Sequence, residues 1–393
     1  MFIKSIRQIK NLVGKKVLLR ADFNVPIEKG KIKDDYKIIT GLPTIRYLLR
    51  HKCKIIIISH LGEPNKNKKQ KIKNKKYSIK PLVLRLSQLI GKKIKFVDDC
   101  LGEKVALAVN KLKFGEILLL ENLRFYSEEE NNDKKFAKKL AKLADIYIND
   151  AFAVCHRNHA SVSAIKKYLP SFAGLLIESE VYNLNKILKP VQPLISIIGG
   201  AKIESKTVLI NKLIKKSYRV LIGGALANNF IAAHGFNIGK SLADKISIKL
   251  AGKLKNEKII LPIDVVIAKK FTSKEAIVKN VNQVTKNDII LDIGPRTIKL
   301  YAKYIKIAST LIWNGPMGYF ENEHFKHGTL TVARLIASRS TGTAFGVVGG
   351  GETVEALKMT KMMEYIDWVS TGGGAMLTYL AGERMPGLEG IVF

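Results

Sequence analysis

The chain has 393 residues, of which 47% are hydrophobic, and a formal net charge of +34. This length predicts two or three domains, and the composition is that of a globular protein, which excludes a disordered or fibrous chain. Lysine supplies most of the positive charge, as a general compositional bias would produce. That explanation is favoured over binding of a polyanion, although a phosphorylated substrate would also suit the charge.

The cysteines and the first residues indicate a reducing compartment. Cys53, Cys100 and Cys155 lie far apart, without the spacing of a zinc site or an even-numbered disulfide set. The opening MFIKSIRQIK carries dispersed charges and lacks the apolar core of a secretory signal. No apolar run approaches the ~18 residues of a membrane span. We therefore expect a cytoplasmic protein without a membrane partner.

Apolar runs typical of strands recur along the chain, each followed by a helical stretch. In the first half they begin at Val17, Ile55, Ile94, Glu116 and Asp145, and in the second at Leu194, Arg219, Lys258, Asp288, Thr310, Thr343 and Asp367. Continuous apolar strands that alternate with helices predict an α/β protein with parallel sheets covered on both faces. A dozen strands are too many for one compact sheet, so we expect two sheets in two domains.

A helix is predicted between the two halves. The stretch LLIESEVYNLNKIL, residues 175–188, places Leu176, Leu184, Ile187 and Leu188 near one face. The KPVQP that follows cannot continue a helix. We therefore expect a first domain over residues 1–175 and a linker helix with a second domain over residues 176–376, with a hinge at the linker. The lysine-rich run 66–76 is predicted to be a solvated loop.

Polar residues and glycines at the predicted strand ends separate the two halves. Ligands of parallel α/β sheets bind beyond the carboxyl ends of the strands. In the first half these positions are mostly polar or cationic: Asp22, Asn24, His60, Asn122, Arg124, Asp150, His156 and Arg157. In the second half they are glycines: 199–200, 223–224, 315, 349–351 and 372–374. Glycine lets backbone N–H groups approach phosphate at a helix N-terminus, so the second half suits a polyphosphate and the first a small anion.

Two lysines and one glutamate follow the glycines. Lys202 and Lys206 are four residues apart on a nascent helix, so they share a face and could neutralise charge during phosphoryl transfer; two solvated lysines are the alternative. Glu352 follows the triple glycine, where a carboxylate suits Mg²⁺ bridging nucleotide phosphates, or simply favours the helix dipole. No GxxxxGK[ST] loop is present, which disfavours a P-loop nucleoside triphosphatase.

Other groups of candidate residues give weaker evidence for catalysis or metal binding. Cys155 and His156 are adjacent and have no evident orienting acid, so a nucleophilic pair is disfavoured. His156 and His159 lack a third ligand at zinc spacing. Arg124 directly follows a buried strand, and we favour an anion contact over a place on a helix surface.

The motifs RADFNVP, LPTI, SHLG, ENLRF, DAFAVCHRNHAS, GGAKIESK, LIWNGPMGYFE, VVGGGET and STGGGA occur along nearly the whole chain. In this order and spacing they resemble the phosphoglycerate kinase family. The resemblance implies two Rossmann-like domains joined by a helix, with residues from about 377 to 393 returning to the first domain. It also implies reversible phosphoryl transfer in glycolysis between 1,3-bisphosphoglycerate and ADP, giving 3-phosphoglycerate and ATP, by a protein that we expect to be a monomer.

The resemblance also implies residue roles. For 3-phosphoglycerate they are Arg20, Asp22, Phe23, Asn24, Lys37, His60, Leu61, Gly62, Glu63, Arg124 and Arg157. For the nucleotide they are Gly200, Lys202, Lys206, Gly223, Asn314, Glu321, Gly349, Gly350, Gly351, Glu352 and Thr353, with Mg²⁺ held by Glu352 through the nucleotide phosphates. Lys37, Lys202, Lys206 and the N–H groups near Gly373 would stabilise the transferred group.

Three positions depart from the family pattern, which has Arg at 37, Arg at 63 and usually Asp at 352. Lys37 keeps the charge but loses the bidentate fork that suits phosphate. Glu63 reverses a charge; a like-charge contact at ~4 Å and an effective dielectric of ~20 costs up to about 4 kcal/mol, less when exposed. We therefore expect weaker phosphoglycerate binding than the pattern implies, partly offset by Lys66 or Lys68.

Two other functions fit parts of the sequence. A binding protein that lost catalysis would explain the altered arginines, but the intact lysines and glycines argue against it. A nucleic-acid binder would explain the charge and the run 66–76, but the chain has no recognisable reading motif and no aromatic platform there. Nucleic acid is therefore an unlikely partner.

Overall fold

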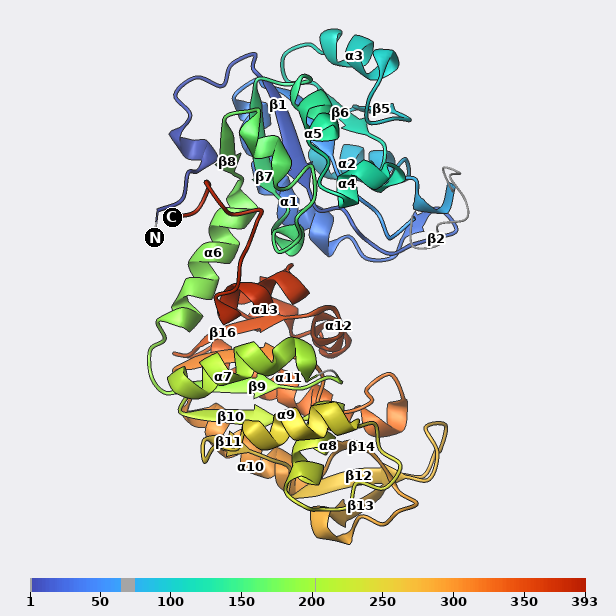
Figure 1. The fold of residues 1–393 in the computed structure, drawn as a ribbon, viewed down its shortest axis with the longest axis vertical. Coiled ribbons are helices and arrows are strands. Elements are labelled where there is room, and N and C mark those ends of the chain that lie inside the picture. Colours follow the sequence, from blue (N-terminus) through green and yellow to red (C-terminus); the bar gives the residue numbers. More distant parts are fainter. Residues whose placement is uncertain (1, 65–74, 202) are drawn as a thin grey trace. The chain divides into compact units, whose positions relative to one another are not determined.

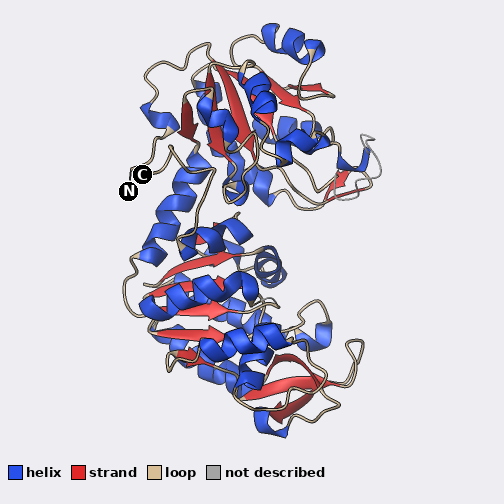
Figure 2. Ribbon diagram, viewed as in Figure 1, coloured by secondary structure: helices blue, strands red, loops and turns tan. Residues whose placement is uncertain are grey.

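The computed structural model describes residues 2–64, 75–201 and 203–393 and divides the chain into two compact units. The first unit comprises Met1–Val181 with Arg384–Phe393, and the second comprises Tyr182–Glu383. Figures 1 and 2 show the helices and strands of each unit.

The first unit is built on six parallel strands in the order β5-β6-β4-β1-β7-β8. Their bounds are β1 (Lys16–Ala21), β4 (Lys54–Ile58), β5 (Ile94–Val97), β6 (Ile117–Leu120), β7 (Ile146–Asp150) and β8 (Ser171–Ala173). The sequence after β1 proceeds to β4 on one side and later returns to β7 on the other. The chain therefore builds the sheet first on one side of β1 and then on the other. Ligands of such sheets bind at the strand ends where the strand order changes sides in this way.

The continuous apolar runs arise because both faces of this sheet are covered. Ile55 and Ile57 of β4 pack into one core cluster, whereas Ile56 and Ile58 pack into the other. The covering helices are α1 (Tyr36–Arg50), α2 (Leu82–Ile90), α3 (Glu103–Asn110), α4 (Ser127–Glu130) and α5 (Lys134–Ala141). Burial of each such isoleucine contributes about 2 kcal/mol, so these clusters hold the sheet between its helices.

The chain end returns to the first unit. Phe2 and Phe393 exchange backbone hydrogen bonds of 2.9 and 2.8 Å, and Asn149 Nδ2 donates to Gly387 O at 3.0 Å. The expected division at residues 175 and 376 differs by a few residues from the bounds of the two units. Both expected boundaries fall within helices, because α6 (Leu175–Leu188) and α13 (Gly373–Ala381) run across them. The predicted linker helix itself is confirmed as α6.

The second unit also has six parallel strands, in the order β11-β10-β9-β15-β16-β17. Their bounds are β9 (Leu194–Ile198), β10 (Arg219–Ile222), β11 (Ile259–Ile260), β15 (Thr310–Asn314), β16 (Phe345–Gly349) and β17 (Trp368–Ser370). Besides α13, its helices are α7 (Thr207–Lys216), α8 (Gly224–Ala233), α9 (Lys245–Lys253), α10 (Pro295–Ile307), α11 (His327–Ser340) and α12 (Gly351–Thr360).

Two predicted strands lie wholly or partly outside the parallel sheets. The run from Lys258 divides at Pro262 into β11 and β12 (Asp264–Ala268), and β12 pairs antiparallel with β13 (Ile277–Asn280) and β14 (Ile289–Ile293). Proline lacks the N–H that would continue the strand pairing, so the chain leaves one sheet there and enters another. The first unit also has a hairpin, β2 (Ile27–Glu28) with β3 (Lys31–Ile32).

The small antiparallel sheet packs against α8 through β14 and against α10 through β12. The fold is therefore α/β with two parallel sheets, as predicted, each of six strands, plus a three-stranded antiparallel sheet and the β2–β3 hairpin, which the sequence pattern did not reveal. Within the described part of the chain, no helix is both long and apolar enough to cross a membrane.

Candidate active site

The carboxyl ends of β1, β4, β6 and β7 bring the predicted polar residues of the first unit together. Arg20 is fully buried in β1, and its guanidinium donates to Ser161 Oγ at 2.9 Å and to Ala21 O at 2.6 Å. Its NH2 lies 3.2 Å from Nδ1 of His60, which directly follows β4 and Ser59. The contact between Arg20 and His60 places two predicted substrate residues side by side.

His60 is buried rather than open to solvent. Only 2% of it is exposed, and its Nδ1 lies 3.8 Å from Asp22 Oδ1. Burial, and then the charges of Arg20 and Arg124, hold the pKa of His60 well below its ordinary value. The imidazole is therefore neutral at physiological pH and can accept or donate a hydrogen bond without adding charge.

Asn24 and Arg124 both form hydrogen bonds with the backbone of Gly62. Asn24 Oδ1 accepts from Gly62 N at 2.9 Å, and Arg124 NH1 donates to Gly62 O at 2.6 Å. Asn122 fixes the same turn, because its side-chain amide donates to Leu61 O at 2.8 Å and its oxygen accepts from Leu61 N at 3.2 Å. Gly62 has a φ of +60°, and an added Cβ would meet the Tyr77 ring, so this position requires glycine.

Lys37 and Glu63, two of the three departures from the family pattern, have different surroundings. Lys37 is the second residue of α1 and its Nζ lies 2.7 Å from Asp22 Oδ2, whereas Glu63 is exposed. Phe23 is buried and its N–H donates to Ser59 Oγ at 2.9 Å. Lys66 and Lys68, expected to compensate for Glu63, lie outside the described residues, as does most of the lysine-rich run.

The segment after β7 supplies a further guanidinium group and two imidazoles. Arg157 is half-buried, and burial with nearby Arg124 lowers the pKa of His159 to about 3. The Nδ1 atoms of His156 and His159 are buried and have no hydrogen-bond partner among the described residues. The guanidinium groups attract anions through their charge, and the neutral imidazoles can donate hydrogen bonds to them.

The Cys155 thiol is fully buried, and burial raises its pKa to about 12. A thiol in this state is protonated and inert, in agreement with the rejected nucleophilic pair. No described residues form a group of three or more histidines, cysteines and acids able to hold a metal. In the first unit, guanidinium groups and hydrogen-bond donors gather at the strand ends, and these groups suit an anion.

The predicted glycines of the second unit also lie at strand ends. Gly199 and Gly200 follow β9, Gly223 precedes α8, and Gly350 precedes α12. The chain packs so closely there that a Cβ on Gly199 would come 2.1 Å from Pro316 O. Gly373 opens α13 with a Cβ position 3.5 Å from Gly350 Cα, so the N-termini of α12 and α13 adjoin. Adjoining helix N-termini favour a negatively charged group.

Asn314 and Thr353 organise the same edge of the sheet. Asn314 Nδ2 donates to Gly349 O at 2.7 Å, and Gly315 N donates to Thr353 Oγ1 at 2.8 Å. Both side chains therefore fix glycine turns. Lys206 is 8% exposed and donates to Gly199 O, and burial lowers its pKa to about 8. Lys202 lies outside the described residues.

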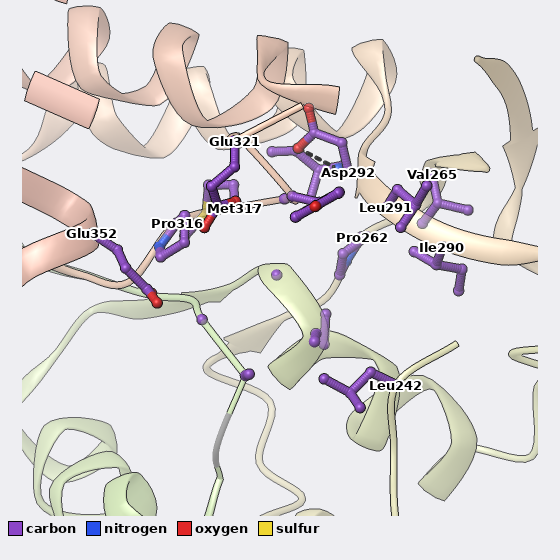
Figure 3. A pocket seen from close by; sticks show the side chains of 18 of the residues that line it. Leu242, Pro262, Val265, Ile290, Leu291, Asp292, Pro316, Met317, Glu321 and Glu352 are labelled. Atoms are coloured by element: carbon purple, nitrogen blue, oxygen red, sulfur yellow. Dashed lines mark hydrogen bonds between the residues drawn. The ribbon is translucent and has the colours of Figure 1, made fainter. Parts of the chain in front are cut away.

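A pocket of about 170 Å³ lies among these turns and β12–β14. Gly200, Glu321 and Glu352, all predicted nucleotide residues, line it. Figure 3 shows Glu352 at one side and Leu242, Ile290 and Leu291 at the other, with Met317 and Glu321 between them. A polar end beside the glycine turns and an apolar end beyond them suit a molecule that is charged at one end and flat and apolar at the other.

The sequence interpretation missed several residues of this pocket. They include Asp292, Met317, Tyr319 and Phe271, the last two with ring centroids 6.0 Å apart in an edge-to-face arrangement. Asp292 lies near the end of a predicted strand, two residues before Gly294, so it shares the strand-end position of the other predicted site residues. Burial raises the pKa of Asp292 to about 8, although the N–H groups of Gly328 and Ile293 lower it.

One unit carries a cluster of cations at the strand ends of its parallel sheet and the other a glycine-lined pocket, as expected for a two-domain α/β phosphotransferase. A family model described as phosphoglycerate kinase matches residues 6–383. The chain belongs to the phosphoglycerate kinase family. It is accordingly a phosphotransferase with a carboxyl group as acceptor, which catalyses reversible phosphoryl transfer in glycolysis with ATP and ADP as nucleotide substrates.

Individual relatives agree over nearly the full length. The chain is 44% identical over 398 residues to the phosphoglycerate kinase of Borreliella burgdorferi (strain ZS7), covering 99% of each chain. It is 43% identical over 399 residues to that of Wolbachia sp. subsp. Brugia malayi (strain TRS), covering 98% of each.

Solved structures agree with the fold. The phosphoglycerate kinase from Coxiella burnetii has a TM-score of 0.85 at 36% identity, covering 99% of this chain and 98% of that chain. That from Pyrococcus horikoshii OT3 has a TM-score of 0.86 at 32% identity with the same coverage.

Proposed function

We propose that the cationic cluster of the first unit binds 3-phosphoglycerate and that the pocket of the second unit binds the nucleotide. The observation that carries the proposal is that the two sheets have different groups at their strand ends. One sheet has guanidinium and imidazole groups there, and the other has glycine turns with Lys206. A charged small acid and a polyphosphate need these two environments.

On the acceptor side, Arg124 and Arg157 hold the phosphate of 3-phosphoglycerate. Neutral His60 and Asn24 hydrogen-bond its polar groups, Asp22 accepts from its hydroxyl, and buried Arg20 orients His60 through their 3.2 Å contact. Lys37 contacts the transferred group. Because Asp22 already holds Lys37 at 2.7 Å, part of the lysine charge is compensated before the substrate binds.

On the nucleotide side, Lys206 and the N–H groups opening α12 and α13 contact the phosphates, with Lys202 as a further cation. Glu352 lines the phosphate end of the pocket. Mg²⁺ usually keeps several waters and is bound by one or two carboxylates together with substrate phosphates. A single carboxylate beside the nucleotide phosphates therefore suits this ion. When bound there, Mg²⁺ neutralises charge on the phosphates. Glu321 lies between the two ends and suits the ribose hydroxyls.

The reaction is a direct in-line transfer. A carboxylate oxygen of 3-phosphoglycerate attacks the γ-phosphorus of ATP while the bond from that phosphorus to the β-phosphate oxygen breaks; the reverse reaction forms ATP. No side-chain nucleophile takes part, in keeping with the inert Cys155 thiol. Lysine charges and helix N-termini stabilise the spread negative charge, so catalysis is positioning with electrostatic stabilisation.

The test is formation of ATP from ADP and 1,3-bisphosphoglycerate, generated by a coupling enzyme, compared between the wild-type protein and Lys206→Met. We expect wild-type turnover and a loss of about 10²- to 10³-fold in the variant. Lys258→Met, a matched change at a lysine on the same unit whose Nζ contacts Ile214 O, should leave the rate unchanged. A wild-type protein that binds both ligands without turnover would instead identify a binding protein.

We further propose that the protein is a cytoplasmic monomer and that duplex DNA is not a partner. Light scattering after size exclusion should give the mass of one chain, 43.8 kDa. Tight binding of duplex DNA at physiological salt would contradict the second part of this proposal.

A further inference from the structure

One buried carboxyl group lies in the wall of the nucleotide pocket without a role in the reaction described above. Asp292, the penultimate residue of β14, is 2% exposed and lines the pocket (Figure 3). Its Oδ2 accepts from Gly328 N at 2.7 Å and its Oδ1 from Ile293 N at 2.9 Å. A buried carboxyl group is costly unless both oxygens are satisfied, so its retention here needs a reason.

The surrounding backbone is shaped around this carboxyl group. A Cβ added to Gly318 would come 2.2 Å from Asp292 Oδ1, and one added to Gly328 would come 2.3 Å from the same atom. Two separate segments, the loop after β15 and the start of α11, therefore approach Asp292 at positions where only glycine fits.

The start of α11 in turn holds the pocket loop. Thr329, the residue after Gly328, accepts at Oγ1 from Met317 N at 3.0 Å and from Gly318 N at 3.2 Å. Tyr319 N donates to Leu291 O at 2.6 Å, next to Asp292 in β14. The loop residues Met317, Gly318 and Tyr319 are thus held by hydrogen bonds to both β14 and α11.

The same loop holds the glycine turns on the opposite wall. Pro316 O accepts from Gly200 N at 2.8 Å, and Met317 O accepts from Gly224 N at 2.8 Å. A continuous series of hydrogen bonds therefore runs from Asp292 through Gly328, Thr329 and the loop to both glycine turns. All of these groups belong to the second unit.

We infer that Asp292 is a positioning residue for nucleotide binding: it fixes α11, and through Thr329 the loop 316–319, in the arrangement that forms the pocket. The inference rests on the proposed binding of ADP and ATP in this pocket. Asp292 acts through backbone groups and is not itself a catalytic residue. A carboxyl group accepts at both oxygens in either protonation state, whereas an amide nitrogen cannot accept at all, so Asp292→Asn sets an N–H group against a backbone N–H.

The experiment is steady-state kinetics of Asp292→Asn with each substrate varied in turn. We expect the KM for ADP to rise about tenfold, as loss of one buried hydrogen bond with a new repulsion would give, and the KM for the phosphoglycerate substrate to stay within twofold. Thr329→Val, which keeps the shape but removes the acceptor for Met317 and Gly318, should show the same separation and carries the test if the first variant fails to fold.

Asp264→Asn is the matched control. Asp264 is equally buried, is on β12 of the same sheet, and caps α10 by accepting from Arg296 N at 2.9 Å and Thr297 N at 2.7 Å, but it does not line the pocket. We expect this variant to lower the melting temperature while the KM for ADP is retained. An unchanged KM for ADP in folded Asp292→Asn and Thr329→Val, or an equal rise in both KM values, would overturn the inference. Absence of ATP formation by the wild-type protein would overturn the proposed function instead.

Discussion

Lys37 and Asp22 form a close ion pair, with 2.7 Å between Nζ and Oδ2, at the carboxyl end of β1. Asp22 is almost fully buried, and the Lys37 side chain remains 28% exposed. The pair joins the sheet to the first turn of α1. Because lysine presents a compact charge with rotatable donors, the hydrogen bond to Asp22 competes directly with one to a substrate phosphate.

Replacing Lys37 by arginine should relieve that competition. A guanidinium can keep Asp22 on one edge and offer a second pair of N–H groups to the substrate. We expect Lys37→Arg to lower the KM for 3-phosphoglycerate about fivefold, equivalent to ~1 kcal/mol. The measurement is the initial rate in the direction of ATP use. Lys33→Arg, at an exposed position of the same unit, is the control and should have no effect. A KM that does not fall in Lys37→Arg contradicts the prediction.

The second departure, Glu63, should act through charge alone. It is exposed, so solvent screens it, and its effect must depend on ionic strength. We expect the KM for 3-phosphoglycerate to fall stepwise in Glu63→Gln and Glu63→Arg, by about threefold in total at low salt and less at high salt. Glu103→Arg makes the same charge change at another exposed position of the unit. If both arginine variants lower the KM equally, the effect is one of net charge and not of position.

The features that could be predicted from the sequence are those that depend on residues close together along the chain. The apolar run through Ile58 was enough to predict β4 and to place His60 at its carboxyl end. The hydrogen bond from Gly328 to Asp292 joins residues 36 positions apart, and no local pattern encodes it. The antiparallel place of β12 was missed for the same reason: an apolar strand has the same appearance in either direction, and only its partners β13 and β14 decide.

Lys206 should set the alkaline limit of activity. Burial lowers its pKa to about 8, so the ammonium carries its charge below that pH and loses it above. We expect kcat/KM for ADP in the free enzyme to fall about tenfold per pH unit above 8. Lys206→Arg, which stays charged, should be slower but lose this alkaline limb. A wild-type profile that is flat up to pH 9.5 would show that Lys206 does not titrate in this range.

His159 should make the folded state sensitive to mild acid. Its pKa is about 3 in the folded protein, whereas an unfolded histidine titrates near 6.5, so the unfolded state binds more protons below that pH. Stability is therefore retained above pH 6.5 and is lost as the pH falls toward 3. Between pH 7.5 and 5.5 we expect the wild-type melting temperature to fall by roughly 3 °C more than that of His159→Gln, or ~1 kcal/mol.

The control for this prediction is His51→Gln, at the C-terminus of α1, where Nδ1 lies 2.9 Å from Tyr47 O. It should follow the wild-type dependence on pH. Parallel melting curves for wild type and His159→Gln would mean that the buried imidazole does not contribute to acid sensitivity.

Asp288 supports the antiparallel sheet that carries Asp292, and its loss should lower stability. Its carboxylate is fully buried and accepts from Lys269 Nζ at 2.6 Å, Lys279 Nζ at 2.7 Å and Thr285 N at 2.8 Å. Burial alone would raise its pKa, but these donors outweigh burial and hold the pKa of Asp288 below its ordinary value. Asp288→Asn leaves two lysines without their carboxylate, which costs about 3 kcal/mol.

We expect the melting temperature of Asp288→Asn to fall by roughly 6–12 °C at pH 7, since ~1 kcal/mol corresponds to about 2–4 °C for a unit of this size. The difference from wild type should shrink below pH 4, because the native carboxylate contributes stability only above the pKa of the unfolded group and loses it on protonation. Asp98→Asn, in an exposed pair with Lys104 whose side chains are 66% and 68% exposed, should change the melting temperature by less than about 2 °C. Equal losses in the two variants would mean that burial of Asp288 confers no additional stability on the sheet.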